Sequence, residues 1–142
     1  MTGAPLSPHA RARVFAVALA VLATAMGLGA RALLAGAVSK ILGDVCWALD
    51  VYALVRFLGP GRPVRFVGAL TLLISFAVEF LQLTSLPASL SSRHVLLRML
   101  LGSEFHATDL LWYLLGVVLG ASSERVALGA RPRATSPIRT GR

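Results

Sequence analysis

The feature that most limits what this chain can fold into is an uncharged run at residues 14–30, which Arg31 closes. The run approaches the roughly 20 mainly apolar residues that a helix needs to cross a bilayer. The chain as a whole is 56% hydrophobic and 14% charged, with a mean hydropathy of +0.76. A soluble domain of 142 residues would need far more polar side chains to cover its surface. The composition therefore predicts an integral membrane protein built as one helical bundle.

Breaks in the apolar pattern predict an all-α, polytopic bundle of four transmembrane helices. Gly59-Pro60-Gly61-Arg62-Pro63 is the strongest break and indicates a tight turn. A short interfacial helix, which carries Arg93 and Arg98, is expected between the third and fourth spans. The predicted spans are 14–30, 41–58, 64–83 and 108–123, and the interfacial helix is 90–101. The predicted domains are a cytoplasmic tail at 1–13, a transmembrane domain at 14–123 and a basic, disordered tail at 124–142.

The basic residues predict how the helices are oriented. With four spans, ten of the 14 Lys and Arg residues lie in the two tails and the second connection, and four lie on the opposite side. The positive-inside rule then places both termini in the cytoplasm. The net charge is +8, and the basic residues that produce it lie between the apolar segments and at the two ends of the chain. This pattern predicts contact with membrane lipid and not with nucleic acid. An alternative is a cleaved secretory signal, with Ala35-Gly36-Ala37 as its cleavage region, which would leave three spans.

A carboxylate inside the third predicted span is the main functional candidate. Glu79 and Gln82 lie three residues apart, one turn along one face of a helix. A charge at the centre of a membrane helix costs about 2.5–3.5 kcal/mol on insertion scales, so Glu79 needs a partner, a proton or a wet cavity. It also lies near the C-terminal end of its helix, where the helix dipole disfavours a carboxylate. A purely structural ion pair, with Arg93 as the partner, is the alternative.

The four-span topology brings further polar residues to the level of Glu79. Asp44 and Asp109 open the second and fourth predicted spans at the same side of the membrane. Glu79, Asp109 and Asp44 are therefore the candidate catalytic residues. The candidate substrate-binding residues are Gln82, Arg93, Arg98, His106, Trp47 and Tyr113.

Most of these residues also have a structural interpretation. Asp44 and Asp109 can each simply begin a helix, with Thr108 as the N-cap before Asp109. Gln82 can hydrogen-bond between helices, and Trp47 and Tyr113 fit an aromatic belt. Gly116 and Gly120 indicate close helix packing, and the residue types predict neither a metal site nor a cofactor.

The ordered motifs carry a resemblance to a known family. The set is Gly43-Asp44 with Trp47, then Glu79-Phe80 with Gln82-Leu83, then Arg93, then Leu101-Gly102 with Phe105, and finally Asp109-Leu110-Leu111 with Tyr113 and Gly116. Over residues 14–122 it resembles the DUF2809 family of small bacterial membrane proteins. The Glu-x-x-Gln pair followed by a helix that starts with Asp also resembles the VanZ-like family, which is linked to teicoplanin resistance and the cell envelope. This chain has Tyr113 where VanZ-like proteins usually have Asn.

Three functions compete at this stage, and whether the protein is an enzyme stays open. The first is a factor of the bacterial cytoplasmic membrane that binds or acts on a lipid-like or anionic lipid-linked substrate, with Glu79 as acid or base. The second is a non-catalytic partner for lipid or for another helix. The third is a proton- or solute-coupled transporter with Glu79 and Asp50 as relay points, which would require a homo-oligomer.

Overall fold

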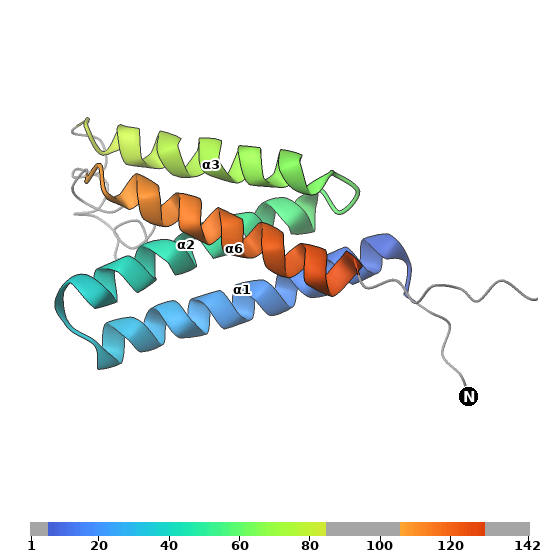
Figure 1. Cartoon of the computed structure of the whole chain (residues 1–142), viewed down its shortest axis with the longest axis horizontal. Coiled ribbons are helices and arrows are strands. Elements are labelled where there is room, and N and C mark those ends of the chain that lie inside the picture. Colours follow the sequence, from blue (N-terminus) through green and yellow to red (C-terminus); the bar gives the residue numbers. More distant parts are fainter. Residues whose placement is uncertain (1–5, 85–105, 130–142) are drawn as a thin grey trace, which may run out of the picture.

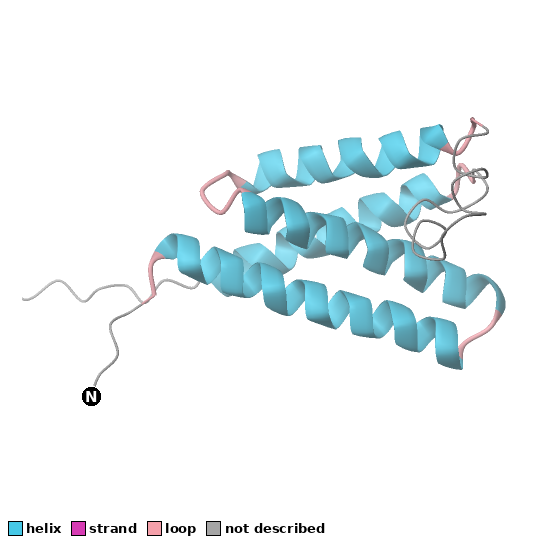
Figure 2. Cartoon of the chain, turned by 180° about the vertical axis from the view of Figure 1, so that it is seen from behind, coloured by secondary structure: helices cyan, strands magenta, loops and turns pink. Residues whose placement is uncertain are grey.

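The structure, a computed structural model, describes residues 6–84 and 106–129 as a bundle of helices, each antiparallel to the next (Figure 1). The helices are α1 (Pro8–Leu33), α2 (Gly36–Leu58), α3 (Val64–Leu81) and α6 (Asp109–Gly129). All the regular structure in these two ranges is helical, which confirms the all-α part of the predicted fold class (Figure 2). Helix α2 is central, because it packs against α1, α3 and α6, whereas α1 contacts mainly α2.

Local residues explain where the helices begin and end. The Ser7 hydroxyl accepts a hydrogen bond of 3.2 Å from the N–H of Ala10, and Pro8 occupies the first turn of α1, where its missing N–H costs nothing. Gly36 has φ of +66°, a conformation that glycine adopts without strain, and it lets the chain reverse into α2. The predicted turn at residues 59–63 separates α2 from α3, as expected.

The helices extend beyond most of the predicted segments. Helix α1 begins at Pro8 and not at residue 14, α2 begins at Gly36 and not at residue 41, and α6 continues to Gly129. The predicted domain boundaries after residues 13 and 123 therefore lie within helices. The predicted interfacial helix at 90–101 lies outside the described residues.

Three of the described helices, α1, α3 and α6, are long and apolar enough to cross a membrane. Helix α2 is as long, but it carries Lys40, Asp44, Asp50 and Arg56. The surface of the bundle is rich in exposed Leu and Val, while the interior holds several polar side chains. The buried polar residues are Arg56, Thr71, Ser75, Glu79, Asp109 and Glu124. This distribution suits a lipid solvent, where the polar groups must be satisfied inside the protein.

Two glycines allow α2 and α6 to pack closely. A Cβ added at Gly116 would lie 2.7 Å from the Cβ of Ala48 and from the carbonyl oxygen of Val45. One added at Gly120 would lie 2.9 Å from the ring of Tyr52. The predicted packing role of this glycine pair is confirmed, and the close approach fixes the side chains of α6 against those of α2.

Candidate functional site

The Glu79 carboxylate is the centre of the candidate site. It lies in the last turn of α3 and its residue is 0% exposed. Its Oε1 accepts a hydrogen bond of 2.7 Å from the backbone N–H of His106, and its Oε2 accepts one of 3.0 Å from the hydroxyl of Tyr113. Because His106 leads into α6, the carboxylate lies near the N-terminal end of that helix, where the dipole favours negative charge. Helix α6 thus provides the compensation that α3 does not.

Lys40 connects the two candidate aspartates. Its Nζ donates to Oδ2 of Asp44 at 3.1 Å, and also to Oδ2 of Asp109 on α6. Asp44 lies inside α2, four residues after Lys40, so the interpretation that it begins a helix is wrong, because α2 begins at Gly36. Asp109 is the first residue of α6, as expected, but its buried carboxylate contacts α2 and does more than begin its own helix. The Lys40–Asp109 pair ties the adjacent ends of α2 and α6 together.

The two predicted aromatic residues contact each other. The ring centroids of Trp47 and Tyr113 are 5.5 Å apart at an interplanar angle of 44°, which is a tilted aromatic pair. Tyr113 is only 7% exposed and points its hydroxyl at Glu79, so it does not belong to a lipid-facing aromatic belt. Its hydrogen bond to a buried carboxylate explains why it turns inward. Trp47 is half-buried and flanks the same site.

The remaining predicted residues are placed less completely. Gln82 is the C-cap of α3 and is half-buried, and His106 contributes its backbone N–H to Glu79. Arg93 and Arg98 lie outside the described residues. The structure therefore brings together five side chains, which we call the polar cluster: Lys40, Asp44, Glu79, Asp109 and Tyr113. Sequence reasoning missed Lys40 as a member, although its spacing of four residues from Asp44 is a helical ion-pair signal.

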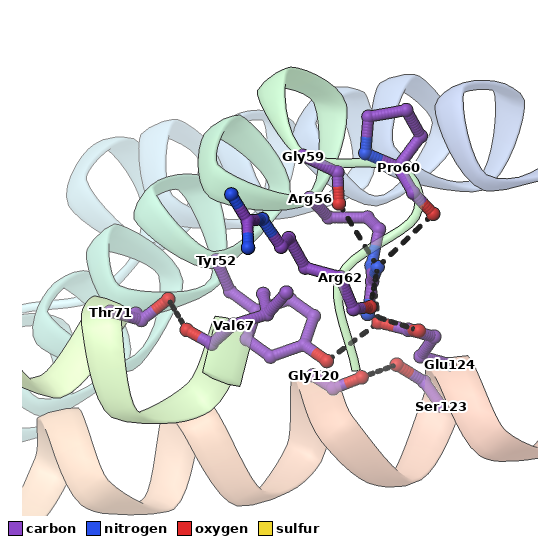
Figure 3. Close-up of polar contacts among 10 residues, drawn as sticks. All are labelled: Tyr52, Arg56, Gly59, Pro60, Arg62, Val67, Thr71, Gly120, Ser123 and Glu124. Carbon is purple, nitrogen blue, oxygen red and sulfur yellow. Dashed lines mark hydrogen bonds and ion pairs between the residues drawn. The ribbon is translucent and has the colours of Figure 1, made fainter. Parts of the chain in front are cut away.

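A second group of buried polar residues, the ion-pair cluster of Tyr52, Arg56 and Glu124, lies at the end of the bundle that holds the turn at 59–63 (Figure 3). Arg56 Nε donates to Glu124 Oε2 at 2.8 Å, and Arg56 Nη2 lies 2.5 Å from Glu124 Oε1. The Tyr52 hydroxyl also donates to Oε2, at 2.7 Å. The guanidinium therefore faces both oxygens of the Glu124 carboxylate, one through the Nε hydrogen bond and the other through an ion-pair contact of Nη2, which makes no hydrogen bond within the described residues.

Arg56 also holds the turn that follows its own helix. Its Nη1 donates to the carbonyl oxygens of Gly59, Pro60 and Arg62 at 3.3, 3.4 and 2.7 Å (Figure 3). These bonds satisfy carbonyl groups just beyond the end of α2, which have no partner within the helix. Sequence reasoning missed this cluster, because Arg56 was counted among the basic residues that set the orientation of the helices, and Glu124 was placed in the C-terminal tail. The sequence did contain a signal for this cluster: Glu124 follows Gly116 and Gly120 at the same spacing of four residues, which places it on the helix face that packs against α2.

The buried face of α3 is polar along two turns below Glu79. Thr71, Ser75 and Glu79 are spaced four residues apart and each is fully buried. The Thr71 hydroxyl donates to the carbonyl oxygen of Val67 at 2.8 Å, whereas Ser75 Oγ has no hydrogen-bond partner among the described residues. Asp50 lies elsewhere and accepts from the Thr24 hydroxyl of α1 at 3.2 Å. The polar face thus leads from the polar cluster toward the middle of the bundle.

The polar cluster can accept hydrogen bonds, exchange protons and pair with charged groups. It offers three carboxylates, one ammonium group and one phenol. In residues 6–84 and 106–129 no group of three His, Cys, Asp or Glu side chains is arranged to hold a metal ion. The five side chains of the polar cluster are acids, bases and hydrogen-bond donors.

The matched family covers the polar cluster. Residues 33–117 match the family described as "Protein of unknown function (DUF2809)". The chain belongs to the DUF2809 family. The DUF2809 match begins where α1 ends and stops before Glu124, so it is shorter than the resemblance over residues 14–122 and leaves out the acid of the ion-pair cluster. No curated protein and no solved structure matches this DUF2809 chain.

Proposed function

We propose that this DUF2809 protein crosses the bacterial cytoplasmic membrane four times, with both termini in the cytoplasm. The three apolar helices support a membrane location. Helix α2 has 23 residues, a length of about 35 Å at 1.5 Å per residue, and it packs between α1 and α3. Because α2 connects two helices that are apolar enough to span, it must return across the same layer. The charges of α2 have partners, as membrane interiors require: Asp50 and Arg56 contact α1 and α6, and Asp44 pairs with Lys40 of α2, which also pairs with Asp109 of α6.

We further propose that the polar cluster binds the polar head of a lipid-like or lipid-linked substrate at the outer leaflet. The observation that carries this proposal is the buried carboxylate of Glu79, which accepts from Tyr113 of α6 and from the backbone N–H of His106 just before α6, beside the Lys40 pairs. Carboxylates accept hydrogen bonds from hydroxyl groups, and Lys40 pairs with phosphate. Arg93 and Arg98 are proposed to add contacts to an anionic group. The VanZ-like resemblance supports a role in the cell envelope.

The test is a mass-spectrometric profile of envelope lipids and peptidoglycan precursors in cells that lack the protein. The cells are rescued with wild type, with Glu79→Gln, or with Asp50→Asn, which makes the same acid-to-amide change outside the polar cluster. At equal membrane abundance, we expect one lipid-linked species to change on deletion and to be restored by wild type and Asp50→Asn only. Rescue by Glu79→Gln, or unchanged profiles, would overturn the proposal. A complete loss with Glu79→Gln would favour catalysis, and a graded loss would favour binding.

Proton- or solute-coupled transport is the second candidate. It is favoured by the buried polar face of α3, on which Thr71 and Ser75 continue inward from Glu79. Four spans leave little room for a pathway within one copy, so this function would require a homo-oligomer. Purified protein in vesicles loaded with a pH-sensitive dye provides the test. Proton flux that wild type supports and Glu79→Gln abolishes is the expected result for transport, and equal flux from both proteins excludes it.

A further inference from the structure

An open groove lies at the other end of the bundle from the polar cluster. It has a volume of about 450 Å³ and runs along α1 beside the end of α2. Val14, Val17 and Ala18 of α1 and Phe57 of α2 form its apolar wall, and Arg13 lies at its edge. Its apolar side chains are mostly exposed, so the groove faces the surroundings of the bundle. Its shape and lining suit a hydrocarbon chain.

Arg13 is held at the edge of this groove with most of its donors unused. Its Nε donates to the carbonyl oxygen of Phe57 at 3.5 Å, and its guanidinium carbon lies 5.7 Å from the centroid of the Phe57 ring. The carbonyl is one of the last in α2, where the helix dipole favours a cation. Of the five N–H donors of a guanidinium, the other four make no hydrogen bond within the described residues. The side chain is thus oriented by α2 and still able to bind an anion.

The charge around the groove favours an anionic occupant. Antiparallel packing brings the start of α1, the start of α3 and the end of α6 to this end of the bundle (Figure 1). Glu124, the acid that the structure places here, is buried against Arg56. Among the described residues, the other arginines at this end are Arg11, Arg13, Arg62, Arg65 and Arg125. Arginines at a membrane surface attract anionic lipids, each by a small and additive amount.

We propose that this groove is a binding site for an anionic phospholipid of the adjacent leaflet. One acyl chain lies against Val14, Val17, Ala18 and Phe57, and the phosphate pairs with the free donors of Arg13. Guanidinium and phosphate form two parallel hydrogen bonds, which explains why arginine suits this position. The proposal depends on the membrane location of the bundle and is independent of any ligand at the polar cluster. It assigns a role to α1, most of which lies outside the matched family range.

Native mass spectrometry of the detergent-purified full chain tests the site. The protein is titrated with phosphatidylglycerol and, separately, with phosphatidylcholine that has the same acyl chains. We expect wild type to bind phosphatidylglycerol more tightly than phosphatidylcholine. The Arg13→Gln variant should bind phosphatidylglycerol about fivefold more weakly than wild type, because one arginine near an anionic surface contributes about that factor. Ala18→Phe fills the groove and should weaken binding of both lipids. Added salt should reduce the effect of Arg13.

Two control variants separate this site from general attraction and from the polar cluster. Arg125→Gln removes a charge at the same end of the bundle but outside the groove. It should therefore lower the affinity for the first bound phosphatidylglycerol molecule less than Arg13→Gln does. Glu79→Gln should leave this affinity unchanged, so a failure of the lipid site and a failure of the polar-cluster proposal are distinguishable. Equal losses for Arg13→Gln and Arg125→Gln, or no loss for Arg13→Gln in a variant that remains folded, would overturn the inference.

Discussion

Replacing Gly116 with alanine is expected to destabilise the bundle, although alanine is the better helix former. The new Cβ would lie 2.7 Å from the Cβ of Ala48 and from the carbonyl oxygen of Val45. Carbon atoms in contact prefer about 3.5–4.0 Å, so α2 and α6 must separate by up to about 1 Å at this level. Overpacking costs about 1–3 kcal/mol, against a gain of about 0.5–1 kcal/mol from removing a helical glycine. We therefore expect a net loss of between about 0 and 2.5 kcal/mol in the free energy of unfolding, with about 1 kcal/mol as the central value.

Gly29 in α1 is the matched control for this change. A Cβ at Gly29 would meet nothing within 4 Å, so Gly29→Ala should raise stability by about 0.5–1 kcal/mol. The two substitutions are chemically identical and are predicted to have opposite signs. Thermal unfolding of the purified chain in detergent, followed by helical circular dichroism, measures both. If Gly116→Ala unfolds at the same temperature as Gly29→Ala, or above it, close packing of α2 and α6 does not limit stability and the reasoning is refuted.

The other predictions concern the buried pairs and use the same unfolding assay. Arg56→Met should cost about 3–5 kcal/mol because it leaves Glu124 buried without its cation, and adding Glu124→Leu should recover most of that loss. A double variant as unstable as the single one would contradict this. Tyr113→Phe removes the hydroxyl that donates to Glu79 and should cost about 1–3 kcal/mol, whereas an unchanged midpoint would mean that the bond adds no stability. Lys40→Met leaves the buried carboxylate of Asp109 without its cation, but the Lys40 side chain is 44% exposed. The loss in the free energy of unfolding should therefore be smaller than for Arg56→Met, about 1–3 kcal/mol, and it should decrease in high salt.

Local signals made the helices and part of the polar cluster predictable. The uncharged run before Arg31 and the Gly-Pro-Gly turn after α2 act within a few residues, and both are where they were expected. Glu79 was identifiable because a lone carboxylate in an apolar helix requires compensation whatever the details of the fold. Asp109 was identifiable as a residue at the same level of the bundle as Glu79, because the predicted antiparallel helices place the end of one span beside the start of the next.

Pairings across long separations were not predictable in the same way. Arg56 and Glu124 are 68 residues apart, and each alone resembles an ordinary charge at a membrane boundary. Their pairing depends on how far α6 continues and on which face it turns to α2, which the packing of Gly120 on Tyr52 decides. The alternative interpretation of Asp44 as the start of a helix was wrong because α2 begins at Gly36, eight residues earlier.

Helix α6 connects the two clusters and determines the geometry of the candidate site. It is held to α2 at three levels: by the Lys40–Asp109 pair, by the close contact of Gly116, and by the Arg56–Glu124 pair. A helix fixed at three points can neither slide nor rotate without breaking one of them, so Tyr113 stays aimed at Glu79. The family match includes the first two levels and ends before the third. The ion-pair cluster therefore reinforces, from outside the matched range, a helix position that the polar cluster needs.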